Sequence, residues 1–169
     1  MLGIIETVHC DSRSKNLSHS PQRKNMNRLG NIIYYVQDVE KTIAFFEKAF
    51  GMEKAFIDPT GQYGQLETGS TALGFASLDL AKQNLPNGFS PVSKKELPGC
   101  EIAFISRDVH RALSRAIKAG AELIASPEEK PWGQTVAYVR DFNGILIEIA
   151  SEMMMEENSS GECHGCDCH

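Results

Sequence analysis

The sequence lacks several features that mark whole classes of protein. No apolar run in its 169 residues approaches the roughly 20 residues that a membrane-spanning helix needs. Its first ten residues have a short apolar start interrupted by Glu6, without the basic segment and long apolar segment of a secretory signal. We therefore expect a cytoplasmic protein with no membrane partner.

Acidic and basic residues nearly balance in the central part of the chain, and the sequence there contains no basic stripe. Of the net charge of -5, residues 1–26 contribute +2, whereas residues 151–169 carry five acids without Lys or Arg. The middle of the chain is therefore nearly neutral, which argues against a nucleic-acid partner.

Cysteine and histidine are scarce in the central part as well. The five cysteines are an odd number, and three of them lie in the last seven residues, so no disulfide framework is indicated. His110 is the one central histidine and falls at the expected exposed start of a helix. The other four lie near the ends of the chain: His9, His19, His164 and His169.

Composition divides the chain into three parts. Residues 1–26 are polar and aperiodic and read as a flexible arm, with Met26 as an alternative natural start. Residues 27–152 are predicted to form one domain, and residues 153–169 a flexible tail rich in Cys and His. Within the domain we expect two modules, about 27–77 and 100–152, joined by a linker over 78–99.

The two modules repeat one order of elements. In each, a strand is followed by a helix that an Asp caps, and then by three short strands with alternating apolar residues. The repeat is visible at an offset of 70, for example in Asp38 with Asp108 and Lys48 with Lys118. We therefore predict an α+β fold of two tandem βαβββ modules. The proline-containing linker is long enough to be a lid or a binding loop, or simply a flexible connection.

One stretch, "NGILIEIAS", raises the question of function because it places Glu148 among isoleucines. Side chains alternate across a strand, so Glu148 faces away from Ile145, Ile147 and Ile149, which mark the helix-packed face. The same phasing puts Glu101 on the non-helix face of the module's first strand. By the repeat, their counterparts in the first module are Asn31 and Gly74.

Several roles are open for the two glutamates. They could simply keep a wide cleft hydrated, bind a cationic group, act as a general base, or hold a weak hard metal. Mutual repulsion would raise the pKa of one of them if they lie close together. Glu148 is the candidate base and Glu101 its partner.

The same phasing predicts further ligand-contacting residues on this face. They are Ile33, Tyr35, Ala72, Ala103, Ile105 and Leu146. The only tryptophan, Trp132 in "KPWGQ", could stack on a planar ligand or pack at a loop corner.

The chain resembles the vicinal-oxygen-chelate superfamily of glyoxalases, bleomycin-resistance proteins and extradiol dioxygenases. The resemblance lies in the duplicated order of elements, in "YYVQDVEKTIAFFEKAFGM" of the first module and in "VAYVRDFNGILIEIAS" at the end of the second. The resemblance implies a curved sheet from each module, together enclosing a cleft, and a homodimer. In metal-dependent members the metal ligands are His, Glu or Gln at the positions of Asn31, Gly74, Glu101 and Glu148. Only the two glutamates qualify here, so the resemblance implies an incomplete ligand set for a divalent metal.

The resemblance leaves two functions open. One is a small-molecule binder with an acidic cleft, and the other is a glyoxalase-type lyase or isomerase, with or without metal, that uses Glu148 as base. Separately, the last seven residues contain five candidate ligands for a soft metal: Cys163, His164, Cys166, Cys168 and His169. They could serve to capture or deliver a metal, or bind one only adventitiously.

Overall fold

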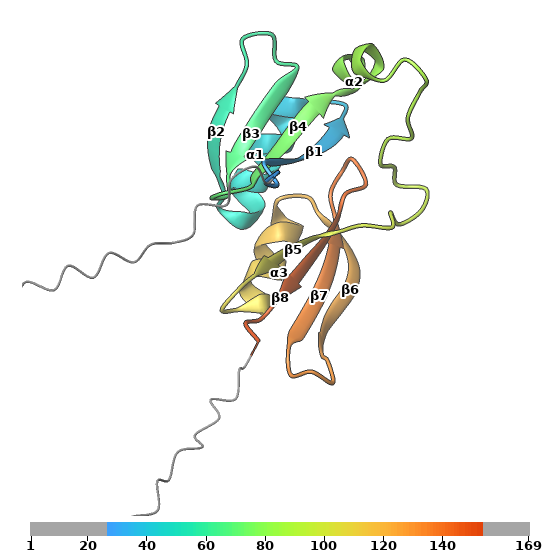
Figure 1. The fold of residues 1–169 in the computed structure, drawn as a ribbon. Coiled ribbons are helices and arrows are strands. Elements are labelled where there is room, and N and C mark those ends of the chain that lie inside the picture. The colour runs from blue at the N-terminus through green and yellow to red at the C-terminus, as the bar shows by residue number, and fades with distance from the viewer. Residues whose placement is uncertain (1–26, 154–169) are drawn as a thin grey trace, which may run out of the picture.

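The computed structural model describes residues 27–153, which form two modules of the same topology (Figure 1). The first contains β1 (Asn31–Val36), α1 (Val39–Phe50), β2 (Glu53–Ile57), β3 (Tyr63–Glu67) and β4 (Ala72–Ser77). The second contains β5 (Ile102–Ile105), α3 (Val109–Lys118), β6 (Glu122–Glu129), β7 (Thr135–Arg140) and β8 (Leu146–Ala150). The strand orders are β1-β4-β3-β2 and β5-β8-β7-β6, so the predicted α+β fold of two βαβββ modules is confirmed.

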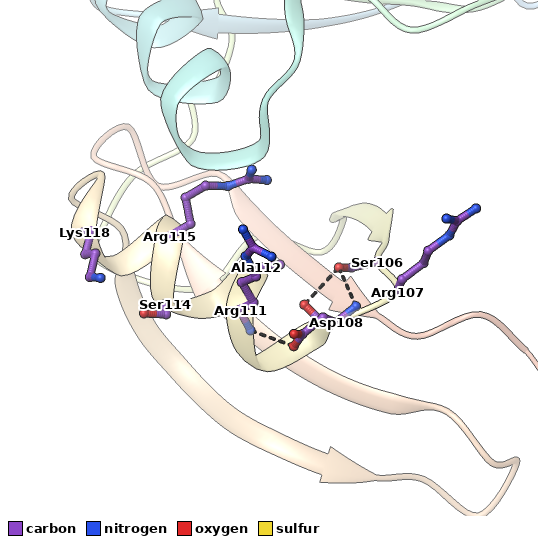
Figure 2. Close-up of a pocket in the computed structure, with 8 residues that line it drawn as sticks. All are labelled: Ser106, Arg107, Asp108, Arg111, Ala112, Ser114, Arg115 and Lys118. Carbon is purple, nitrogen blue, oxygen red and sulfur yellow. Dashed lines mark hydrogen bonds between the residues drawn. The ribbon is translucent and has the colours of Figure 1, made fainter.

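The two helices begin in the same way because the same residue caps each of them. The Asp38 carboxylate accepts a hydrogen bond from the Lys41 backbone N–H at 2.9 Å. In α3 the Asp108 carboxylate accepts one from the Arg111 backbone N–H, also at 2.9 Å (Figure 2). Each bond satisfies an N–H that has no partner within its helix, as the repeated Asp predicts.

The two modules also pair their first and last strands in the same way. In the parallel pair β1–β4, Ile33 lies opposite Gly74, and in β5–β8, Ala103 lies opposite Glu148, so the offset is 70 for the first strands and 74 for the last. Ile147 and Ile149 are fully buried, whereas Glu148 between them is half-buried on the other face. The predicted phase of β8 is therefore confirmed.

One hydrophobic core serves both modules. It includes α1, α3 and the helix-facing residues of both sheets. Phe46 and Phe50 of α1 lie against Phe104 of β5, with ring centroids 6.2 Å and 4.6 Å apart. The first module's helix thus covers part of the second module's sheet. No helix among residues 27–153 combines the length and apolar character that crossing a membrane requires.

The structure differs from the predicted elements in three places. A short helix, α2 (Leu78–Asn84), opens the linker and is capped by the Ser77 hydroxyl. β5 begins at Ile102, so Glu101 precedes the strand in which it was predicted. β6 continues to Glu129 past Pro127, because the register shifts between Ala125 and Glu128 and the proline falls in that irregularity.

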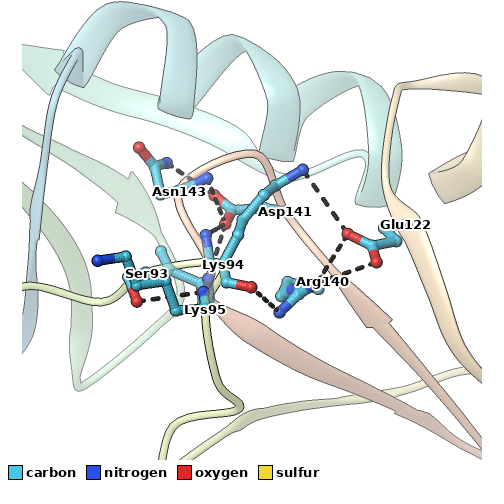
Figure 3. A network of polar contacts seen from close by, with 9 residues as sticks. Ser93, Lys94, Lys95, Glu122, Arg140, Asp141 and Asn143 are labelled. Carbon is cyan, nitrogen blue, oxygen red and sulfur yellow. Dashed lines mark hydrogen bonds and ion pairs between the residues drawn. The ribbon is translucent and has the colours of Figure 1, made fainter.

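The turn between β7 and β8 holds the linker against the second module (Figure 3). The buried Asp141 carboxylate accepts hydrogen bonds from the backbone N–H groups of Asn143, Gly144 and Ile145 at 2.8–2.9 Å. Burial raises the pKa of Asp141, and these hydrogen bonds oppose that rise. One Arg140 Nη donates to the Lys94 carbonyl at 2.9 Å, which fixes the linker beside this turn.

Gly144 allows the linker to approach this turn closely. Its φ is +105°, and a Cβ at this position would lie 2.4 Å from the backbone C and O of Ser93. A side chain at Gly144 would therefore face both an unfavourable backbone conformation and a backbone clash.

We expect Gly144→Ala to lower the free energy of unfolding by roughly 3 kcal/mol, measured by urea denaturation. Gly133→Ala is a matched control, because Gly133 also has a positive φ (+87°) but open space around its Cβ position. It should cost only about 1 kcal/mol of backbone strain. Equal losses in the two variants would contradict the proposed contact with Ser93.

Candidate functional site

Glu148 meets a tyrosine from the neighbouring strand. The antiparallel register of β7 and β8 places Tyr138 opposite Glu148, on the sheet face away from the helices. The Tyr138 hydroxyl donates a hydrogen bond to Glu148 Oε2 at 2.6 Å. This bond to Glu148, with burial and the charge of the carboxylate, raises the pKa of Tyr138 to about 12. Tyr138 therefore remains a donor at neutral pH and fixes the orientation of the carboxylate.

Glu101 approaches the same carboxylate from the start of β5. Burial raises the pKa of Glu101, and the charge of Glu148 and a hydrogen bond with its carboxyl group raise it further. Glu101 binds a proton more readily beside Glu148, because ionising it brings a second negative charge next to the first. Glu101, Glu148 and Tyr138, hereafter the acidic cluster, thus form one interacting group.

The matching positions of the first module hold neutral groups. Gln65 lies opposite Gly74, as Tyr138 lies opposite Glu148. Gln65 Nε2 donates to the Tyr63 hydroxyl at 2.6 Å, and a Cβ at Gly74 would lie 2.8 Å from that hydroxyl. The Tyr63 side chain therefore occupies the space that a side chain at Gly74 would need.

The sequence prediction missed Tyr63, Gln65 and Tyr138. The pairing of the last two strands in each module identifies Tyr138, ten positions before Glu148, and Gln65, nine positions before Gly74. Tyr63 lies two residues before Gln65 and therefore on the same face of β3. Alternation within a single strand does not supply this register.

A hollow of about 590 Å³ lies between the edges of β1 and β5. Four of the predicted residues line it, namely Ile33, Ala72, Glu101 and Ala103, and Cys100 lies beside them. Most of the remaining lining is apolar, so Glu101 is the acidic group at the wall of a largely apolar space.

The other predicted residues lie outside this hollow. Asn31 is exposed at the start of β1, and Leu146 lies opposite Arg140 at the start of β8. Tyr35 packs against Phe89 of the linker, with ring centroids 5.2 Å apart. Trp132 is 58% exposed, and its Nε1 donates to Gln134 Oε1 at 2.9 Å in the β6–β7 turn.

Within the described residues, the side chains present do not make up a catalytic zinc centre. A catalytic zinc site needs about three protein ligands, and within residues 27–153 no group of three His, Cys, Asp or Glu side chains comes together. Gly74 offers no donor, and its position is covered by Tyr63. The predicted tail ligands Cys163, His164, Cys166, Cys168 and His169 lie outside the described residues.

Comparison with known proteins gives consistent results. The sequence profile of the Glyoxalase/Bleomycin resistance protein/Dioxygenase superfamily matches residues 28–149. "Virulence protein STM3117" of Salmonella typhimurium is 24% identical over 137 residues, covering 78% of this chain and 89% of that protein.

Solved structures show the same fold. A glyoxalase-related enzyme from Fulvimarina pelagi superposes with a TM-score of 0.62 at 18% identity, covering 75% of this chain and 89% of that one. TioX from Micromonospora sp. ML1 gives a TM-score of 0.56 at 20% identity, with 74% and 98% covered. At these identities the likeness concerns the fold alone.

The acidic cluster makes a prediction about proton binding. We expect Glu148→Gln to lower the pKa of Glu101 and to bring that of Tyr138 down from about 12, because the negative charge beside both groups is removed. NMR titration of the Glu101 carboxyl carbon and of the Tyr138 ring measures both changes. Glu53→Gln, which removes an exposed carboxylate from β2, should leave both values unchanged. Unchanged values in Glu148→Gln would show that the cluster does not interact.

Proposed function

Because the chain belongs to the glyoxalase/bleomycin resistance protein/dioxygenase superfamily, we propose that it binds a small molecule at the acidic cluster and the adjoining hollow. One observation carries the proposal: Tyr138 holds the Glu148 carboxylate beside Glu101, which lines a largely apolar hollow. Such a site favours a ligand with a cationic or hydrogen-bond-donating group attached to an apolar or aromatic body. The exposed Cys100 thiol is compatible with the reducing cytoplasm as the place of action.

A direct binding measurement tests this function. Bleomycin is the first probe, since the superfamily description includes resistance to it, followed by a panel of aromatic amines and their neutral analogues. We expect at least one cationic compound to bind more tightly than its neutral analogue, and Glu148→Gln to weaken that binding about tenfold. Glu53→Gln serves as the control. Equal affinity for charged and neutral analogues would contradict an acidic binding site.

The Glu101–Glu148 pair also favours a second function, proton transfer in a lyase or isomerase. Glu148 would accept a proton from a carbon next to a carbonyl group and return it to a neighbouring atom, while Tyr138 keeps the carboxylate oriented. Glu101, whose pKa is raised by burial and by the charge of Glu148, would act as the partner of this base. No step in this scheme requires a metal.

A glyoxalase-type assay with methylglyoxal and glutathione separates the two functions. If the protein is such an enzyme, Glu148→Gln should lower kcat by a factor of 100 or more, and Tyr138→Phe by less, because the base itself remains. Running the assay with and without added Mn²⁺ tests the proposed weak hard metal on Glu101 and Glu148. Turnover unchanged by Glu148→Gln would rule out its role as base.

We propose in addition that the protein acts as a homodimer. β1 and β5 are edge strands, and their apolar residues are strongly exposed: Ile32 48%, Ile33 43% and Ile105 59%. Exposed apolar edge strands are sites of pairing with another chain. A second copy along these edges would cover the hollow and remove these residues from water.

We expect the unmodified protein to have the mass of a dimer in light scattering after size exclusion, and Ile105→Lys to have that of a monomer. Leu97→Lys is the matched control, because Leu97 is 50% exposed but lies in the linker. It should remain a dimer. A monomeric mass for the unmodified protein at high concentration would contradict the proposal.

A further inference from the structure

The exposed side of α3 carries a concentration of positive charge. Arg107, Arg111, Arg115 and Lys118 line a hollow of about 540 Å³, in which Asp108 is the only acidic residue (Figure 2). We call this the basic α3 surface. It stands out because the whole chain has a net charge of -5.

Little of this positive charge is neutralised by neighbouring residues. The Asp108 carboxylate already accepts the Arg111 backbone N–H as the helix cap. Arg115 Nε donates to the Ala49 carbonyl at 2.7 Å, which ties that residue to the first module. Among residues 27–153, none of the four basic residues forms an ion pair with a carboxylate. The basic α3 surface therefore suits an anionic partner.

The end of the described chain lies next to this surface. A second hollow, of about 580 Å³, shares Ser106 and Arg107 with the first and is lined by Ser151, Glu152 and Met153. The chain thus reaches its last described residue in contact with the same space that Arg107 lines.

The residues that follow have the complementary charge. Positions 154–169 contain Glu156, Glu157, Glu162 and Asp167 and no Lys or Arg. Sixteen residues can extend over roughly 50 Å, whereas the ten residues of α3 cover only about 15 Å. The length of this segment is therefore ample to reach Lys118.

We propose that residues 154–169 bind the basic α3 surface of their own chain, with their carboxylates paired with Arg107, Arg111 and Lys118. The attraction is between exposed charges, so it weakens with salt, as the screening length falls to about 3 Å at 1 M. Covalent connection favours the segment over free acidic peptides, because its local concentration at the surface is high. This proposal does not depend on the function of the acidic cluster.

Carbodiimide cross-linking of the full-length protein tests the proposal, because this reagent joins a carboxylate to an amine that it already contacts. Lys118 is the only amine at the basic α3 surface, and Lys54 is an exposed control amine in β2. By mass spectrometry we expect at least ten times more links from Glu156, Glu157 or Glu162 to Lys118 than to Lys54. The links to Lys118 should fall at least fivefold in 1 M NaCl.

A pair of charge variants tests the surface itself. Arg107→Gln with Arg111→Gln keeps Lys118 as the reporter and should reduce its links at least threefold. Lys48→Gln with Lys95→Gln removes the same amount of charge from exposed positions elsewhere and should leave the number of links to Lys118 unchanged. Circular dichroism confirms that both variants are folded.

Three outcomes would overturn the proposal. The first is equal linking to Lys118 and Lys54, and the second is linking to Lys118 that is undiminished in Arg107→Gln with Arg111→Gln. The third is hybrid links, which join an ordinary chain to a ¹⁵N-labelled chain in a mixture of the two. Hybrid links would assign the acidic segment to the surface of a second copy instead of its own.

Discussion

The stacking of Phe50 on Phe104, with Phe46 beside them, is the contact on which the rest of the structure depends. A module of about 50 residues buries only a limited apolar surface by itself, and the core that the two modules share adds to it. α1 supplies aromatic side chains to the β5 side of the second module. This shared core determines where the edges of β1 and β5 lie, and therefore where the hollow beside Glu101 opens.

Much of the fold could be predicted from sequence because its signals are local. The caps at Asp38 and Asp108, the alternation around Glu148 and the offset of 70 each involve neighbouring residues or a simple repeat, and the structure confirms them. The partners of Glu148 were not predictable in this way. Tyr138 reaches it through the register of β7 on β8, which turn length and irregularities set. The position of the hollow depends on how the two modules pack against each other. The hydrophobic pattern within one module does not predict that packing.

The two modules share one backbone topology but carry different side chains at matching positions. The second offers two carboxylates and a tyrosine donor, and the first offers the neutral pair Tyr63 and Gln65 around Gly74. In the proposed site, a ligand with one cationic end would bind in one orientation, because the two carboxylates lie on only one module. The repeated modules thus supply a common backbone arrangement, and the few side chains that differ between them make the charge of the site asymmetric.

The contact of Tyr63 with Gly74 also limits how this protein can evolve. Introducing a carboxylate at position 74 would place its Cβ 2.8 Å from the Tyr63 hydroxyl, so the end of the tyrosine side chain would have to move aside. That movement would disturb the hydrogen bond from Gln65 to Tyr63. A new acidic group in the first module would therefore come with the loss of the neutral pair that now occupies this face.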